Sequence, residues 1–203
     1  MAYRKASDNL FIEGAIQKVA EIGIENTRTK EVADYAGFSE ATMYRRFPTK
    51  ENLLAETFYY IDKQISDILT ESNYIRNPGG TSFETAIYEI WHKVFRYLID
   101  NKEKTIFLIR YRYSSLYTDE IRRKRQAYNG RFGPAYKIFE KHFGNSDKSS
   151  ASFLINYIFE MTLCFAERIA SGKLEDDRAT EQAIWLAISS AVNAWTCTKG
   201  GTT

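Results

Sequence analysis

The chain has 203 residues, of which 44% are hydrophobic and 27% charged, and its 28 basic and 26 acidic side chains leave a net charge of +2. This composition is typical of a globular protein of one or two domains and excludes disordered, collagen-like and low-complexity chains. A charge so close to balance does not by itself indicate a nucleic-acid partner. With 2 cysteines and 2 histidines, a disulfide framework is excluded, and we expect neither a metal site nor a cofactor.

No segment has the pattern of a secretory signal or of a membrane helix. The N-terminal stretch MAYRKASDNLF lacks the apolar core of a signal peptide. The longest apolar runs are far shorter than the ~20 residues that span a bilayer. We therefore expect a cytoplasmic protein without a membrane partner.

Helical periodicity dominates the first third of the chain. From Ile12 onward, apolar residues recur at the spacing of one helix face. Ser7 or Asp8 is predicted to cap the start of this helix, and Gly23 to end it. The predicted helices that follow are 29–36 with Thr29 as N-cap, 40–46 with Ser39 as N-cap, and a long helix from Thr49 to about residue 72.

The rest of the sequence continues in the same way after a loop rich in Asn, Gly and Ser at 72–82. Helical patterns cover about 83–100, 103–116, 118–143, 149–171 and 178–196. Gly130, Gly133 and Pro134 predict a kink or break within 118–143. The fold class is therefore predicted to be all-α, with about nine helices.

The segment Thr29–Leu54, TKEVADYAGFSEATMYRRFPTKENLL, indicates a function. Two short helices meet at a tight turn at Gly37, which is the helix-turn-helix arrangement. Its second helix presents hydrogen-bonding and cationic side chains outward, as a recognition helix in a DNA major groove does. Lys50 begins the next helix, where a bound phosphate would meet both its ammonium and free backbone amides.

These residues resemble the DNA-binding signature of the TetR family of transcriptional regulators. The elements that carry the likeness are Thr29, Ala36-Gly37, Ser39, Thr42, Met43, Tyr44, Phe47, Lys50 and Glu51-Asn52-Leu53-Leu54. Glu40-Ala41 and Arg45-Arg46 depart from the residues common in the family. The resemblance implies a helix-turn-helix DNA-binding domain over residues 1–48 and a helical effector-binding and dimerisation domain over 49–203.

The predicted DNA contacts lie in and around the second helix of the motif. They are Thr29, Ser39, Glu40, Ala41, Thr42, Tyr44, Arg45, Arg46 and Lys50. Glu40 has three readings, as a helix cap, as a reader of a cytosine amino group, or as a surface residue that repels phosphate. Residues 1–60 contain 8 basic and 9 acidic side chains, so local rather than net charge must attract DNA, and we expect binding to require a dimer.

Aromatic residues crowd the region from Phe83 to Phe143. Most of them are expected in the core, yet so many tyrosine hydroxyls favour a cavity with polar groups in its wall. The family resemblance implies an effector pocket here, for a small molecule that is apolar or aromatic. The predicted lining is Trp91, Phe95, Tyr111, Tyr113, Tyr128 and Phe132, with Arg110 as a candidate partner for an anionic group or, alternatively, a structural arginine.

Small residues alternate with large ones in the predicted last helix, which allows another helix to approach closely. The resemblance implies that the last two helices form a homodimer, which would match a palindromic operator. We therefore expect a ligand-responsive repressor that leaves its operator when a small molecule binds. The alternatives are an activator, or a helix-turn-helix protein without an effector. An enzyme is not expected, because no catalytic constellation is evident.

Overall fold

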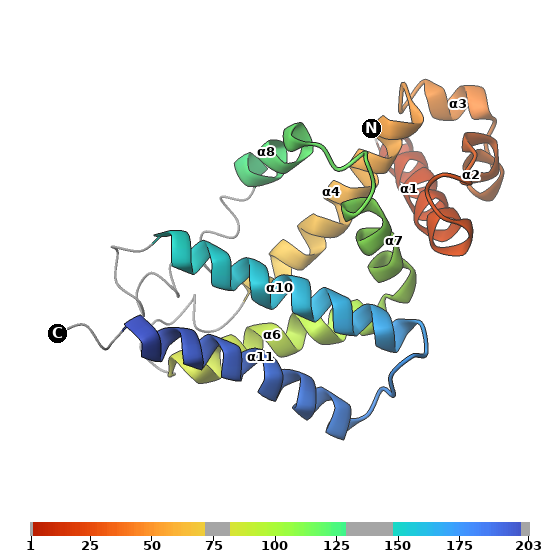
Figure 1. Ribbon diagram of the computed structural model, residues 1–203. Coiled ribbons are helices and arrows are strands. Elements are labelled where there is room, and N and C mark those ends of the chain that lie inside the picture. The colour runs from red at the N-terminus through yellow and green to blue at the C-terminus, as the bar shows by residue number, and fades with distance from the viewer. Residues whose placement is uncertain (1, 72–81, 129–147, 200–203) are drawn as a thin grey trace. The chain divides into compact units, whose positions relative to one another are not determined.

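The computed structural model describes residues 2–71, 82–128 and 148–199, and throughout these ranges the regular structure is α-helical (Figure 1). The prediction of an all-α fold is confirmed. None of the helices in these ranges is long and apolar enough to cross a membrane.

The N-terminal helices are α1 (Ala2–Ile22), α2 (Thr29–Tyr35), α3 (Glu40–Tyr44) and α4 (Lys50–Thr70). The caps predicted for α3 and α4 are confirmed, because Ser39 Oγ accepts from Thr42 N at 3.2 Å and Thr49 Oγ1 accepts from Asn52 N at 3.1 Å. Gly23 ends α1 with a φ of 88°, as predicted.

Two predicted helix starts are wrong. The helix α1 begins at Ala2, so Ser7 and Asp8 lie within it. Nothing in the preceding residues breaks a helix, and alanine, arginine and lysine all favour one. For α2 the N-cap is Arg28, whose backbone N–H donates to Glu31 Oε2 at 3.3 Å. Thr29 is therefore the first helical residue, and its hydroxyl has other partners.

The remaining helices are α6 (Phe83–Asp100), α7 (Lys102–Arg112), α8 (Asp119–Tyr128), α10 (Lys148–Ala170) and α11 (Arg178–Lys199). α6 agrees with its predicted range. α7 ends four residues earlier than predicted, where Ser114 Oγ donates to the Tyr111 carbonyl oxygen at 2.8 Å and turns the chain away. The predicted break at Gly130, Gly133 and Pro134 lies outside the described residues.

The chain forms two compact units. Unit 1 contains residues 1–65 and 101–128, and unit 2 contains residues 66–100 and 129–203. α4 contributes its first part to unit 1 and its end, from Ser66, to unit 2. This division reflects only how the helices pack. The boundary between a DNA-binding domain and an effector-binding domain at residues 48 and 49 remains a prediction.

Unit 1 is built on α1, against which both α2 and α7 pack. Its core is aromatic. Phe11 contacts the rings of Phe38 and Phe47 at centroid distances of 5.3 and 6.2 Å. Further along, Tyr111 of α7 stacks on Phe58 of α4 at 5.2 Å. Burial raises the pKa of the Tyr111 hydroxyl, which keeps this phenol neutral.

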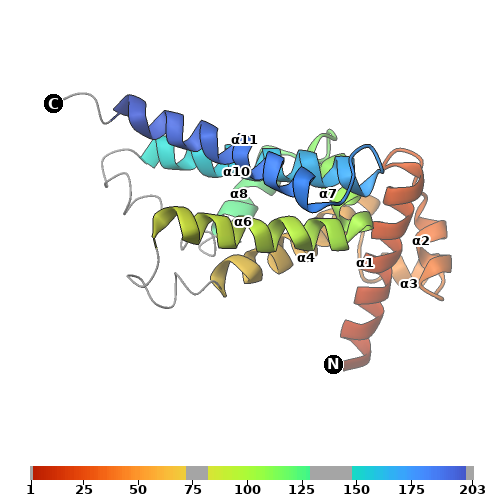
Figure 2. The ribbon, with the colours of Figure 1, turned by 90° about the horizontal axis from the view of Figure 1, so that it is seen from below.

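In unit 2, α10 packs against both α6 and α11 (Figure 2). The buried side of α6 includes Trp91, Phe95 and Leu98. Arg96 Nη1 binds Asp176 Oδ1 at 2.7 Å and so holds α6 to the connection before α11. The helices of unit 2 are thus joined by an apolar core and by an ion pair at its edge.

Candidate functional site

The turn between α2 and α3 is closed by a Schellman motif. Gly37 N donates to the Asp34 carbonyl oxygen at 3.1 Å, and Phe38 N donates to that of Ala33 at 3.0 Å. Gly37 has a φ of 74°, in the left-handed region that glycine adopts without strain. This turn directs α3 away from α2 and leaves one face of α3 exposed.

Gly14 of α1 allows α2 to approach closely. A Cβ at this position would lie 3.0 Å from the Val32 carbonyl oxygen and 3.1 Å from a ring carbon of Tyr35. Val32 and Ala33 of α2 are buried beneath it. The role of Gly14 was not predicted, because the sequence does not distinguish a helix glycine that is needed for close packing from one that is merely tolerated.

Three of the predicted DNA contacts share one hydrogen-bond cluster. The Thr29 hydroxyl donates to the Glu40 carboxylate, and its oxygen lies 3.1 Å from the Tyr44 hydroxyl. Tyr44 remains 43% exposed. Glu40 thus makes a contact within the motif, from the first turn of α3 to the first residue of α2.

A second group continues along α3. The Ser39 and Thr42 hydroxyls lie 2.9 Å apart, and Arg45 Nη2 donates to Thr42 Oγ1 at 3.0 Å. The side chains of Ala41 and Arg45 are exposed. Hydroxyl and guanidinium groups therefore lie along the exposed face of α3, where both phosphate oxygens and base edges are suitable partners.

Arg46 and Lys50 differ from these residues, because each also has a contact that supports the fold. Arg46 Nε lies 3.6 Å from Asp8 Oδ1 of α1, and its side chain is 18% exposed. Lys50 Nζ donates to the Ile24 carbonyl oxygen at 2.7 Å. An ammonium has three donors, so this bond leaves Lys50 able to bind a phosphate as well.

The residues predicted to line the effector pocket are divided between the two units. Trp91 and Phe95 are buried in unit 2 and stack at 4.8 Å. In unit 1, Tyr111 is buried and Tyr113 is 78% exposed. The Tyr128 side chain and Phe132 lie outside the described residues.

Arg110 binds the main chain of unit 1. Its Nη1 donates to the carbonyl oxygens of Val19 at 2.5 Å and Ala20 at 3.3 Å, in the last turn of α1. This geometry agrees with the structural alternative for Arg110 rather than with a ligand-binding role.

Unit 2 contains a half-open pocket of about 350 Å³ between α6, α10 and α11. Its apolar wall is formed by Ile87, Tyr88, Ile158, Trp185, Ile188 and Val192. Trp91 lies behind this wall, with its ring centroid 5.0 Å from that of Trp185. The sequence indicated α11 only as a packing helix, so Trp185 was missed, although it lies one turn from Ile188 on the same helix face.

The polar groups that line the pocket come from α6 and from α11. Glu84 and Thr85 lie in the first turn of α6, and Ser189 and Asn193 lie on α11. The pocket therefore combines an extended apolar surface with a few hydrogen-bonding groups, which is the usual constitution of a small-molecule site.

The comparisons with known proteins agree with this geometry. Residues 11–57 match the family model described as bacterial regulatory proteins, tetR family. None of the curated proteins matches the chain.

Solved structures of TetR-family regulators share the fold. One from Marinobacter aquaeolei VT8 is 24% identical with a TM-score of 0.72, over 96% of this chain and 98% of the other. A second, from Shewanella sp. PV-4, is 17% identical with a TM-score of 0.73, over 91% and 97%. A third, the regulator FadR from Bacillus subtilis in complex with stearoyl-CoA, is 18% identical with a TM-score of 0.66, over 89% and 97%.

The matched segment runs from the core of α1 to α4 and includes the whole helix-turn-helix. The N-terminal helices thus match the tetR family model, and the chain as a whole shares its fold with solved structures of TetR-family regulators.

Proposed function

We propose that this regulator is a repressor that binds a palindromic operator through α3 and leaves it when a small molecule binds to unit 2. The observation that carries the proposal is the polar surface of α3, where the Arg45 guanidinium is hydrogen-bonded to the Thr42 hydroxyl and Tyr44 is exposed beside Thr29. Ser39, Glu40 and Ala41 complete the face. Such a regulator acts in the cytoplasm and performs no catalysis.

The residues divide into base readers and phosphate contacts in this proposal. Thr42 and Arg45 are hydrogen-bonded to each other, so they would read adjacent positions of one base-pair step as a unit. Tyr44, Thr29 and Lys50 would bind phosphates and fix the orientation of α3 in the groove. Arg46, held by Asp8, would contribute positive charge near the backbone rather than a base contact.

The regulator acts as a homodimer in this proposal, with α10 and α11 at the interface. Support comes from the outer face of α11, where Ala183, Leu186, Ala187 and Ala191 are exposed. Leu186 is 66% exposed and Phe153 of α10 is 53% exposed. Exposed apolar side chains are suitable for a contact between subunits, and a two-fold dimer would present two copies of α3 to a palindrome.

The effector site in this proposal is the pocket between α6, α10 and α11. The complex of the B. subtilis regulator with stearoyl-CoA supports the idea that a protein of this fold takes up a small molecule. α4 offers a route for the response, because one continuous helix of 21 residues begins at Lys50 beside α3 and ends in unit 2. At ~1.5 Å per residue it is roughly 30 Å long, so a small tilt moves its N-terminus appreciably.

Selection from a pool of random duplexes tests the proposal. The purified full chain should enrich a palindromic sequence, and the Thr42→Ala, Arg45→Ala double variant should enrich it less or shift its sequence. Enrichment of a single half-site without symmetry would exclude the dimeric mode. Enrichment of no sequence would exclude specific DNA binding. A protein that enriched a palindrome but responded to no small molecule would instead be a regulator without an effector.

A further inference from the structure

The hydrogen bonds among Thr29, Glu40 and Tyr44 have a direction. Thr29, the first residue of α2, contacts both Glu40 and Tyr44 of α3. A carboxylate only accepts hydrogen bonds, so the single proton of the Thr29 hydroxyl is donated to Glu40. The Tyr44 oxygen lies 3.1 Å from the Thr29 oxygen, and because the Thr29 proton is already in use, Tyr44 is the donor of this second bond. The chain of donors therefore runs from Tyr44 to Thr29 to Glu40.

This direction decides what the Tyr44 hydroxyl presents to a bound molecule. Tyr44 is 43% exposed, but its only proton points to Thr29, so the outer side of its oxygen carries lone pairs. The oxygens of a DNA phosphate are acceptors too, and they are negatively charged. While Thr29 donates to Glu40, Tyr44 can donate to a phosphate only by giving up its bond to Thr29. Two hydroxyl oxygens 3.1 Å apart would then have no proton between them, which opposes the phosphate contact.

The carboxylate of Glu40 holds the protons in this direction. A hydrogen bond to an ionised acceptor is roughly twice as strong as one between neutral groups, and each bond in a chain polarises the next. The bond between Thr29 and Glu40 is also partly buried, so water competes less for it. A side-chain amide at position 40 can instead donate to the Thr29 oxygen. Thr29 would then donate to Tyr44, whose own proton would be free to point outward.

We propose that Glu40 is a positioning residue for DNA binding, which turns the Thr29 and Tyr44 protons inward and so weakens the phosphate contact of each subunit. The inference rests on the proposed function, in which Thr29 and Tyr44 bind phosphates. It differs from plain repulsion between Glu40 and a phosphate, because it acts through the Thr29 hydroxyl. It also differs from base reading by Glu40, because phosphate contacts carry no sequence information.

A double-mutant cycle on the full chain tests the inference. The four proteins are the wild type, Glu40→Gln, Thr29→Val and the variant with both substitutions, and fluorescence anisotropy gives their affinities for the selected palindrome and for a shuffled duplex. Glu40→Gln should bind both duplexes more tightly. Valine has the shape of threonine without its hydroxyl, so in the Thr29→Val background the Tyr44 proton is free with either residue at position 40. The gain from Glu40→Gln should therefore be about fivefold larger per subunit with threonine than with valine, which is the effect of one hydrogen bond.

Asp34→Asn is the matched control for charge. It removes one negative charge from an exposed position of α2 and leaves the three linked groups in place. Its effect on affinity should be the same with threonine or valine at position 29. Every variant is first melted to verify that it is folded, and Thr29→Ala, which also lacks the hydroxyl, takes the place of a valine variant that does not fold.

Three results would overturn the inference and leave DNA binding by α3 standing. The first is a gain from Glu40→Gln that persists undiminished without the Thr29 hydroxyl, which would mean that Glu40 acts by repulsion alone. The second is weaker binding by folded Glu40→Gln, and the third is a changed base preference. A wild-type protein that bound neither duplex would overturn the proposed function and the inference together.

Discussion

Arg110 Nη1 donates a hydrogen bond to the carbonyl oxygen of Val19, 91 residues earlier in the chain. Val19 and Ala20 belong to the last turn of α1, and the Val19 oxygen accepts from Gly23 N at 3.0 Å as well as from Arg110. A guanidinium at this end also opposes the negative pole of the helix dipole. Arg110 therefore caps α1 from α7 and ties the helix that supports the DNA-binding motif to a distant part of the sequence.

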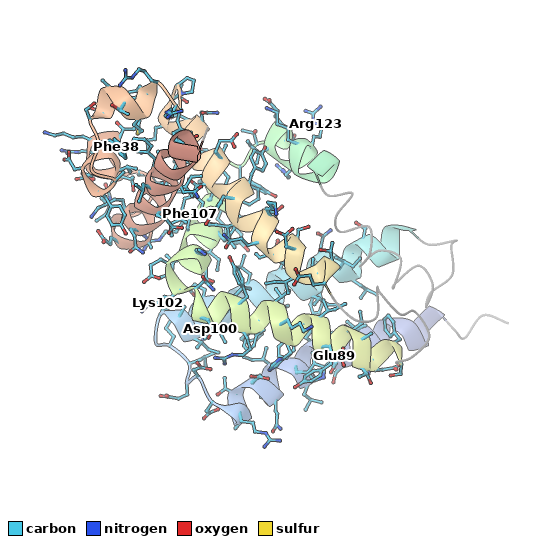
Figure 3. The ribbon with its side chains drawn as sticks, turned by 180° about the vertical axis from the view of Figure 1, so that it is seen from behind. Phe38, Glu89, Asp100, Lys102, Phe107 and Arg123 are labelled. Atoms are coloured by element: carbon cyan, nitrogen blue, oxygen red, sulfur yellow. The ribbon has the colours of Figure 1, made fainter. Side chains whose placement is uncertain are left out.

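Replacing Arg110 should destabilise unit 1. We expect Arg110→Ala to lower the free energy of unfolding by about 1–2 kcal/mol, because charged hydrogen bonds to the main chain are lost. Urea denaturation followed by circular dichroism measures this change. Arg123→Ala is the control, since Arg123 is exposed on α8 (Figure 3) and should change stability by less than about 0.5 kcal/mol. Equal effects of the two substitutions would show that Arg110 does not cap α1.

Gly14→Ala should separate α1 from α2. The added Cβ would meet a main-chain oxygen at 3.0 Å, and an oxygen of the main chain cannot move aside as a flexible side chain does. We expect a loss of about 1–3 kcal/mol of stability, typical of overpacking, although alanine is the better helix former. Thermal denaturation followed by circular dichroism measures this loss. Asn9→Ala, at an exposed position of α1, serves as the control and should be neutral or slightly stabilising. A stabilised Gly14→Ala protein would mean that α2 can shift at little cost.

The sequence predicted those parts of the fold that depend on contacts between residues close together in the chain. The caps of α3 and α4 and the turn at Gly37 involve residues no more than five positions apart, so local residue types were sufficient to predict them. The cap of α1 by Arg110 joins residues 91 apart, and no spacing in the sequence indicates such a pair. The N-cap of α2 was assigned to Thr29 because threonine favours that position, but Glu31 bonds back to the N–H of Arg28 and moves the start by one residue.

The candidate DNA-binding surface and the pocket were also predicted only where their residues are close together in the sequence. The residues of α3 were found from the motif, because one short helix carries most of them. The partners of Arg46 and Lys50, Asp8 and Ile24, come from α1 and from the residues just after it, and were not predicted. The pocket of unit 2 is built from three helices, and its aromatic wall includes Trp185 of α11. Aromatic density in the sequence indicated the region of α6 but could not show which helices would face it.

Lys50→Ala and Tyr44→Phe should weaken binding to all duplexes alike, because phosphates carry no sequence information. Lys50→Ala should also reduce the slope of log K against log salt concentration by about one, which corresponds to the loss of one phosphate contact. Thr42→Ala or Arg45→Ala should instead relax the preference among bases. Fluorescence anisotropy on the selected duplex and on a shuffled one separates the two classes.

Lys173→Ala is the control for these variants, because it removes one positive charge from the exposed connection after α10, outside unit 1. Its affinity for both duplexes should equal that of the wild type. Since Lys50 also binds the Ile24 carbonyl oxygen, each variant should first be melted to verify that it is folded. An unchanged affinity of folded Lys50→Ala at physiological salt would contradict its assignment as a phosphate contact.

Ala187→Arg should disrupt the proposed dimer. Ala187 lies on the exposed face of α11, and an unpaired charge buried there would weaken association by about 3–5 kcal/mol. Sedimentation equilibrium should therefore find a dimer for the wild type at micromolar concentration and a folded monomer for the variant. Ser171→Arg adds the same charge in the connection before α11 and should leave the dimer intact. A monomeric wild type would exclude α11 as a stable interface.

The affinity for the selected palindrome relative to a shuffled duplex, measured at about 150 mM salt, tests most directly whether α3 reads DNA sequence. For a specific regulator the ratio should be about 10³ or more. Both affinities should fall about tenfold or more over a fourfold rise in salt, because each subunit neutralises several phosphates. The Thr42→Ala, Arg45→Ala variant should lower the ratio while retaining the salt dependence. A ratio near one for the wild-type protein would contradict sequence-specific binding by α3.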